Sequence, residues 1–167
     1  MAYKIAFYKG TSPKLWDAIQ QWAVRIWSRG KYSHCEFIDD NGSSDPNTWT
    51  WIAATSYNPG ISAARMIEFK YGHWDVFNLP DDVDYAPAMD WQMSNLGKDY
   101  DWVGIWLSQF LGLNIDDSDR YFCSEFTMKA LKMTALLRGD TKRPESYSPN
   151  SMYRKLKTMD ELTKWQK

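Results

Sequence analysis

The 167-residue chain is poor in the residues on which disulfide frameworks and metal sites depend. It has two cysteines, Cys35 and Cys123, and two histidines, His34 and His73. A single pair of cysteines in a chain of this length does not make a disulfide framework, so a reducing, cytosol-like compartment is the simpler expectation. The four side chains lack the paired spacing of a zinc site, and we therefore expect no metal ion and no cofactor.

An excess of charge of either sign is also missing. The formal net charge is −1 at pH 7, and the sequence pI is about 6.1. A chain with this balance has no overall electrostatic attraction for nucleic acid or for an anionic membrane. We therefore expect no nucleic-acid partner.

Long apolar runs and targeting signals are not visible in the sequence. The longest apolar run covers residues 102–113, which predicts a buried helix and no integral membrane segment because the run is too short to cross a bilayer. Residues 1–5 lack the apolar core of a signal peptide, so a cytoplasmic location is expected. Without repeats, low-complexity tracts or linkers, residues 1–167 are predicted to form a single domain, in which residues 140–167 are a C-terminal extension.

Aromatic residues, by contrast, are abundant: the chain has ten tryptophans, ten tyrosines and seven phenylalanines. Most of them must lie in the core of a protein of this size, and the remainder can form the wall of a cleft. We take Tyr32, Trp51 and Tyr121 as the candidate substrate-binding residues.

The N-terminal residues predict a strand followed by a helix. Residues 4–8 are mostly apolar and precede a glycine, as in a short strand. Ser12 before Pro13 is typical of a helix N-cap with proline at the first helical position, and Arg29-Gly30 is typical of a helix end. Four apolar residues of this helix share one face: Leu15, Ile19, Trp22 and Ile26.

The rest of the chain predicts strands followed by helices. Further strands are expected at residues 32–38, 47–55, 60–69 and 73–77, and helices at residues 86–96, 102–111, 123–135 and 149–156. This order indicates an α+β fold in which an antiparallel sheet packs against helices.

Cys123 has the sequence context of a reactive thiol. The polar run at residues 116–119 leads into the cysteine, after which apolar residues recur at three- and four-residue steps, so a helix is predicted to begin there. At a helix N-terminus the unpaired N–H groups and the helix dipole lower a thiol pKa from its free value of about 8.5 and so favour the nucleophilic thiolate. The alternative is that Cys123 is a small buried apolar residue, as most free cysteines are.

His34 and Glu36 form the second informative pair. In a strand over residues 32–38, alternation places these two side chains on one face and Cys35 on the other, with His34 and Glu36 about 7 Å apart along the chain. They suit a base and the group that orients it, although Glu36 has to reach back along its own strand, or else binds substrate or pairs with a cation. The alternative for His34 is a half-buried histidine with its hydrogen bonds satisfied. Cys35 and His73 look structural.

Cys123 and His34 together have the chemistry of an activated thiol. The imidazole takes the thiol proton, the thiolate attacks a carbonyl carbon, and a third group holds the ring. Glu36 is the candidate for that third group. Asp101, otherwise the predicted N-cap of the helix that begins at Trp102, is the alternative. The backbone N–H of Cys123 is the natural oxyanion donor.

Three motifs resemble a known family. Tyr32-Ser33-His34-x-Glu36, Tyr100-Asp101-Trp102-x-Gly104 and Tyr121-Phe122-Cys123-Ser124-Glu125 are similar to motifs of the circularly permuted NlpC-type papain-like hydrolases, which are related to the lecithin retinol acyltransferase group. As in that branch, the histidine strand precedes the cysteine helix. The segments Pro59–Arg65 and Trp74–Pro80 add to a resemblance that covers about residues 3–135.

The resemblance implies a permuted papain-like fold, with Cys123 as nucleophile, His34 as base and Glu36 as third member. It also implies hydrolysis or transfer at amide and ester carbonyls. Similar chains often occur in bacteriophage genomes, which adds a virion-associated location to the cytoplasmic one. We expect a thiol protease or amidase whose partner is a peptide, a peptidoglycan fragment or an acyl substrate. The alternatives are a lipid thioesterase or acyltransferase, and a non-catalytic phage structural protein that keeps the fold. The residues leave the substrate and the oligomeric state open.

Overall fold

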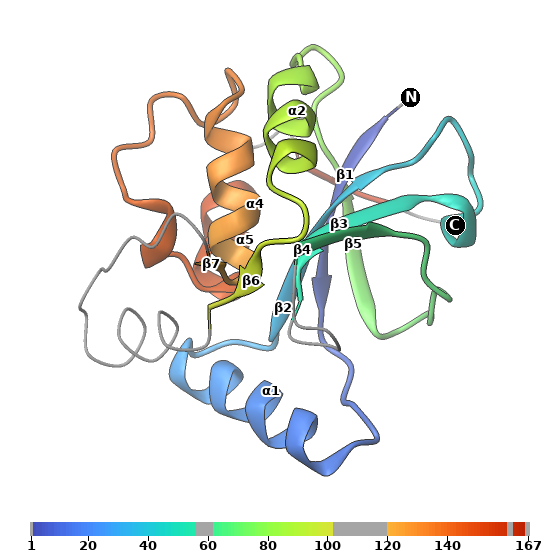
Figure 1. The fold of residues 1–167 in the computed structure, drawn as a ribbon, viewed down its shortest axis with the longest axis vertical. Helices are drawn as coiled ribbons and strands as arrows, with labels where there is room; N and C mark the ends of the chain where they lie inside the picture. Colours follow the sequence, from blue (N-terminus) through green and yellow to red (C-terminus); the bar gives the residue numbers. More distant parts are fainter. Residues whose placement is uncertain (1, 56–61, 102–119, 160–161, 166–167) are drawn as a thin grey trace.

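The computed structural model describes residues 2–55, 62–101, 120–159 and 162–165. Its centre is a six-stranded sheet with the strand order β4-β3-β2-β1-β5-β8, in which every neighbouring pair is antiparallel (Figure 1). The strands of this sheet are β1 (Tyr3–Tyr8), β2 (His34–Asp39), β3 (Thr50–Ala54), β4 (Ser62–Arg65), β5 (Trp74–Asn78) and β8 (Thr163–Lys164).

Helices complete the fold in the described part of the chain. They are α1 (Leu15–Trp27), α2 (Ala86–Ser94), α4 (Cys123–Lys132) and α5 (Pro149–Lys157), with 3₁₀ turns at η1 (Pro46–Thr48) and η3 (Pro144–Ser146). Two short strands, β6 (Asp99–Tyr100) and β7 (Arg120–Tyr121), pair in parallel beside α4. The predicted α+β class with a mainly antiparallel sheet is therefore confirmed.

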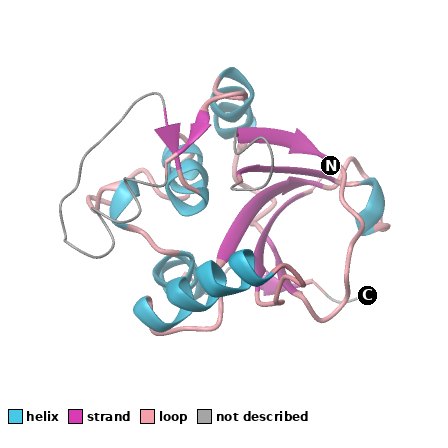
Figure 2. Cartoon of the chain, turned by 60° about the horizontal axis from the view of Figure 1, so that its bottom comes forward, coloured by secondary structure: helices cyan, strands magenta, loops and turns pink. Residues whose placement is uncertain are grey.

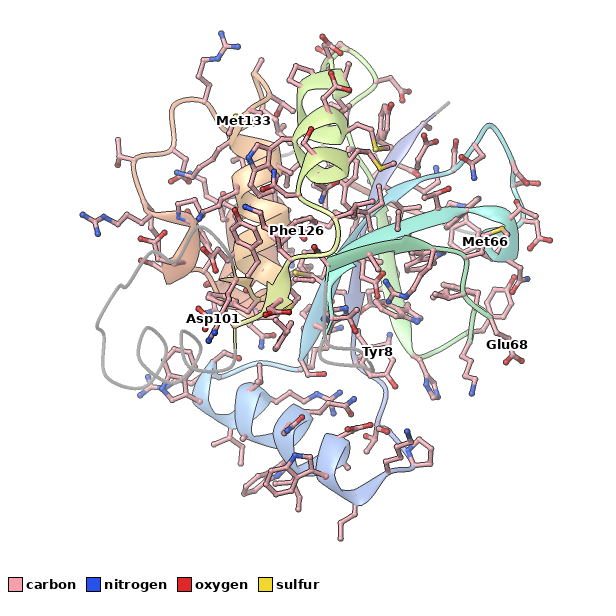
Figure 3. The ribbon with its side chains drawn as sticks, viewed as in Figure 1. Tyr8, Met66, Glu68, Asp101, Phe126 and Met133 are labelled. Carbon is pink, nitrogen blue, oxygen red and sulfur yellow. The ribbon has the colours of Figure 1, made fainter. Side chains whose placement is uncertain are left out.

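The two faces of the sheet carry different cores. Residues of β1 and β2 alternate between them, because successive side chains of a strand point to opposite faces. Helices α2, α4 and α5 lie to one side of the sheet in Figure 1, and Figure 2 shows how strongly the strands curve. The core on the α4 side includes Ile5, Phe7, Cys35, Phe37 and, from α4, Phe126, all with no exposed surface. Phe126 is labelled in Figure 3.

The opposite face is covered by aromatic rings. Trp49 and Trp51 stack with ring centroids 6.2 Å apart, and Phe69 lies 5.8 Å from Trp51. Trp165 closes this layer against Trp49 at 5.1 Å. Much of the aromatic content therefore forms core, as the sequence predicted.

Helix α1 departs from its predicted form in two ways. It begins at Leu15 rather than Pro13, because Lys14 has extended backbone and the Ser12 hydroxyl accepts the Lys14 N–H at 3.2 Å in a turn before the helix. Its apolar face exists but does not face the core: α1 contains no buried residue, and Leu15 and Trp22 are 77% and 64% exposed.

The C-terminal part is anchored to the sheet and to α1. The predicted cap is confirmed, because the Ser148 hydroxyl accepts the Ser151 N–H at 3.2 Å and α5 begins at Pro149. Asn150 of this helix accepts the Tyr32 N–H at 2.9 Å and donates to the Ser28 hydroxyl at 2.5 Å, just after α1. Strand β8, which the sequence did not predict, pairs with β5.

Several other predicted elements are shorter or fall elsewhere. The strand expected at residues 47–55 starts at Thr50 because Pro46–Thr48 form a 3₁₀ turn, and the one expected at 60–69 ends at Arg65. The helix expected at residues 102–111 lies outside the described residues. Within the part of the chain that the structure describes, none of the helices has the length and apolar character needed to span a bilayer.

Candidate active site

Cys123 is the first residue of α4, as predicted. The N-cap residue Phe122 makes no side-chain cap bond, and Glu125 of the first turn instead accepts a hydrogen bond from the Phe122 backbone and pairs with Lys129 at 3.0 Å. Burial raises the pKa of Glu125 to about 7, although Lys129 opposes this rise. Glu125 therefore fixes the start of the helix on which the thiol is mounted.

Packing of α4 against β2 brings the Cys123 thiol to the His34 imidazole. The two side chains share a hydrogen bond, and Cys123 is only 4% exposed. Burial lowers the pKa of His34, but the charge and hydrogen bond of Cys123, together with Glu36, outweigh burial and raise the pKa to about 9. The arrangement therefore favours an imidazolium ion beside a thiolate.

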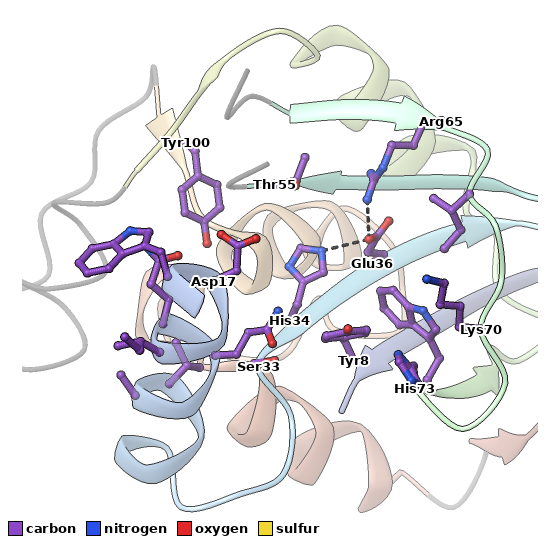
Figure 4. Close-up of a pocket in the computed structure, with 18 of the residues that line it drawn as sticks. Tyr8, Asp17, Ser33, His34, Glu36, Thr55, Arg65, Lys70, His73 and Tyr100 are labelled. Atoms are coloured by element: carbon purple, nitrogen blue, oxygen red, sulfur yellow. Dashed lines mark hydrogen bonds and ion pairs between the residues drawn. The ribbon is translucent and has the colours of Figure 1, made fainter. Parts of the chain in front are cut away.

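Glu36 reaches back along β2 to the imidazole. Its Oε1 atom lies 3.0 Å from His34 Nε2 and 2.7 Å from Arg65 Nη2, as the dashed lines of Figure 4 show. Glu36 is 1% exposed; burial alone raises its pKa, yet Arg65 and then His34 bring the pKa below its ordinary value. The carboxylate thus stays charged between two cationic partners.

Arg65 reaches this position through the register of the sheet. It stands opposite Trp51 on β3, and Trp51 stands opposite Ile38 on β2, so its long side chain crosses β3 diagonally to Glu36. The resemblance included Arg65 but assigned it no role. Its signal in the sequence is a lone cation at the end of the short strand Ser62–Arg65.

Cys35 does more than fill the core. Its thiol donates to the Met152 sulfur at 3.8 Å. Its thiol and backbone also lie against Cys123, and this thiol contact is the leading cause of the lowered Cys123 pKa; burial opposes it and His34 adds to it. Burial raises the pKa of Cys35 itself well above its ordinary value, as does the contact with Cys123. Cys35 is therefore the neutral thiol of the pair, and it lies in the core as expected of a structural residue.

Tyr100 is a functional candidate that the sequence reasoning passed over. Its hydroxyl hydrogen-bonds to Cys123, and burial together with the charge of Cys123 raises its pKa well above the ordinary value. The residue ends β6 and lines the cavity next to the site (Figure 4). Its place in the Tyr100-Asp101-Trp102 motif was the available signal.

Asp101 has a different position from Glu36. It is 6% exposed, follows β6 (Figure 3), and its backbone N–H donates to the Tyr121 carbonyl at 3.0 Å. Glu36, by contrast, contacts the His34 ring directly. The helix that Asp101 was expected to cap lies outside the described residues.

A cavity of about 1050 Å³ opens between α1 and the face of the sheet that carries His34 and Glu36 (Figure 4). One wall is helix α1, and the other includes Arg65, Lys70 and Glu68. The buried thiol touches two lining residues, His34 and Tyr100. A substrate bound in the cavity therefore lies next to His34, Tyr100 and the Cys123 thiol.

The three predicted substrate-binding residues lie in the cores, and none is among the residues that line this cavity. Trp51 is completely buried and Tyr121 is 4% exposed. Tyr32 is 1% exposed, and its hydroxyl donates to the buried Asp75 at 2.7 Å. The aromatic lining comes instead from Tyr8, Trp16, Trp74 and Tyr100.

His73 is also part of the cavity wall. Its carbonyl accepts the Lys9 and Gly10 N–H groups at 2.8 and 3.1 Å, which ties the end of β1 to β5. In the described residues, no group of three or more His, Cys, Asp or Glu side chains is placed to hold a metal ion.

Comparison with protein-family models and with curated proteins gave no match to this chain.

Proposed function

We propose that the protein is a cysteine-dependent hydrolase that cleaves amide bonds. The observation that carries the proposal is the continuous chain of contacts from the Cys123 thiol through the His34 ring to the Glu36 carboxylate. Nucleophile, base and orienting group in mutual contact are what covalent catalysis at a carbonyl requires. The permuted papain-like fold is part of the proposal, supported by a histidine strand that precedes the cysteine helix and packs against it.

The reaction follows from these positions. The Cys123 thiolate attacks the carbonyl carbon, and the oxygen becomes an oxyanion near the Cys123 N–H and the Tyr100 hydroxyl. The His34 imidazolium gives its proton to the leaving amine, which departs and leaves a thioester on Cys123. His34, now neutral, takes a proton from water as the water attacks the thioester, and acid product and thiolate are released.

Glu36 and Arg65 act on this sequence through His34. Glu36 accepts the ring hydrogen bond at Nε2, which leaves the other ring nitrogen to face Cys123 and stabilises the imidazolium charge. Arg65 keeps the buried carboxylate ionised. Both are positioning residues for the base.

The cavity supports a peptide-like substrate. Arg65, Glu68 and Lys70 bring charge of both signs to one wall, which suits the carboxylates and amines of short peptides, including peptidoglycan peptides. A second candidate, an acyl ester of a lipid, is favoured by the other wall, where α1 contributes Ile19, Ala23 and Val24.

The test compares variants on a panel of peptidoglycan peptides, simple amides and acyl esters. Cys123→Ala abolishes turnover, His34→Ala comes close to that, and the double variant is scarcely worse than either because the residues act as one unit. Glu36→Gln keeps a hydrogen-bond acceptor but loses the charge, so we expect a loss of about 10- to 1,000-fold. Cys35→Ala removes the other cysteine and keeps measurable turnover, which distinguishes it from Cys123→Ala.

Full activity in the Cys123 and His34 variants on whichever substrate is cleaved contradicts the proposal. If Glu36→Gln keeps full turnover and Asp101→Asn loses most of it, the role of orienting His34 belongs to Asp101. Preference for acyl esters over amides selects the lipid alternative.

A further inference from the structure

The apolar side chains of helix α1 face outward from the protein. Its exposed residues are all apolar: Leu15, Trp16, Ile19, Trp22, Ile26 and Trp27. The exposed fractions of these six side chains range from 39% for Trp27 to 77% for Leu15. A helix of a water-soluble surface has the reverse pattern, with polar residues outward.

The polar residues of α1 hold the helix to the protein instead. Asp17 accepts the Ser12 hydroxyl at 3.2 Å, and Gln21 accepts the Ser12 N–H at 2.9 Å. Arg25 donates to the Gly10 carbonyl and, at 3.1 Å, to the Ser33 hydroxyl. These contacts fix the rotation of the helix, so the apolar face is held outward rather than turned there by chance.

The size and composition of this face mark an interaction surface. Contiguous apolar patches on a protein surface are functional more often than scattered apolar residues. Three of the six residues are tryptophans, whose indole rings favour the boundary between lipid headgroups and acyl chains. The helix is about 20 Å long at 1.5 Å per residue, enough to lie along a bilayer surface.

Cationic residues flank the apolar face of α1 and favour binding to an anionic surface. Lys14 precedes the helix and Arg29 follows it, and both are exposed. Lys31, also exposed, is paired with Asp75 at 2.8 Å and adds little to this border. Asp17 is the one acidic residue within α1, and it is bonded to Ser12. The net charge of the whole chain gave no sign of membrane attraction, because this local cationic border is balanced by acids elsewhere.

We propose that α1 docks the protein on an anionic lipid bilayer, with its apolar face in the headgroup region and its cationic ends at the phosphates. Trp16 and Ile19 are exposed and also line the cavity, so docking places the mouth of the cavity at the lipid surface. In Figure 1 the helix lies at one end of the molecule, away from α2 and α4. The docking does not depend on the proposed hydrolase activity.

The experiment is flotation with vesicles of phosphatidylcholine, with or without about one-third phosphatidylglycerol. The wild-type chain floats with the anionic vesicles and much less with the neutral ones. Trp22→Gln with Ile26→Gln lowers the partition coefficient by at least about tenfold, and Lys14→Gln with Arg29→Gln lowers it by about fivefold per charge. Cys123→Ala floats like wild type, which separates docking from catalysis.

The matched control is Met66→Gln with Met133→Gln. These two methionines are 70% and 44% exposed and lie away from α1 (Figure 3), so the double variant floats like wild type. Hydrogen exchange of the wild-type chain provides a measurement that needs no variant: peptides covering residues 15–27 gain protection when anionic vesicles are added.

Three results overturn the proposal. The first is a wild-type chain that stays off anionic vesicles and shows no added protection in α1. The second is an α1 variant that floats as wild type does. The third is a wild-type dimer in light scattering that the α1 variant breaks, without vesicle binding, which assigns the face to a second copy of the chain.

Discussion

Replacing Arg65 by glutamine removes the cation that keeps the buried Glu36 charged. The two groups lie 2.7 Å apart, and Glu36 is 1% exposed while the Arg65 side chain is 30% exposed. With an effective dielectric constant of about 20, the direct attraction at that distance is about 6 kcal/mol before desolvation. Removing one partner of a buried pair costs about 3 to 5 kcal/mol. Because Arg65 is partly exposed, we expect about 3 kcal/mol of lost stability at pH 7.

The stability difference between wild type and Arg65→Gln depends on pH. In the wild-type chain the pKa of Glu36 is lowered, so its contribution is present above the unfolded pKa and is lost as pH falls through the folded pKa. Without Arg65, only His34 opposes burial, so the pKa of Glu36 rises above its wild-type value and the variant loses less stability as the pH falls and Glu36 takes up a proton. The difference in unfolding free energy between wild type and Arg65→Gln therefore shrinks from pH 7 to pH 5.

Urea unfolding followed by circular dichroism measures this difference. Arg143→Gln is the matched control: Arg143 is 69% exposed and lies 3.9 Å from Glu145, so its loss changes stability by less than about 0.5 kcal/mol. The double variant Arg65→Gln with Glu36→Gln regains part of the loss, because no charge is left buried alone. Equal effects of the two arginine variants, or a double variant no more stable than Arg65→Gln, refute the reasoning.

The remaining predictions concern the chemistry of the site. Iodoacetamide near pH 6.5 labels Cys123 much faster than Cys35, because the Cys123 pKa is lowered and the Cys35 pKa is raised. Peptide mass spectrometry locates the adduct, and faster labelling of Cys35 contradicts the assignment of Cys123 as nucleophile. Cys35→Ala removes the contact that most lowers the pKa of Cys123, so the pH midpoint of Cys123 alkylation moves to a higher value; an unchanged midpoint contradicts this effect of Cys35. Because the Tyr100 hydroxyl is placed to bind the oxyanion, Tyr100→Phe lowers kcat by about 10- to 1,000-fold with little change in KM. Steady-state kinetics on whichever substrate of the panel is cleaved measures this effect, and an unchanged kcat contradicts it.

Local sequence patterns determined the elements that carry the proposed catalytic residues. Alternation in β2 placed His34 and Glu36 on one face, the helical period placed Cys123 at the start of α4, and Ser148-Pro149 marked the start of α5. Each of these depends on neighbours a few residues away, which is why the sequence alone was sufficient.

Tertiary structure decided the surroundings of these residues. Arg65 reaches Glu36 only through the register of three strands, and the contacts of Cys35 and Tyr100 with Cys123 arise only when α4 packs against the sheet. The periodicity of α1 was visible in the sequence, but its orientation was not. A helical period states which residues share a face, whereas the hydrogen bonds of Gln21 to Ser12 and of Arg25 to Ser33, in the segments that flank the helix, decide which face turns outward.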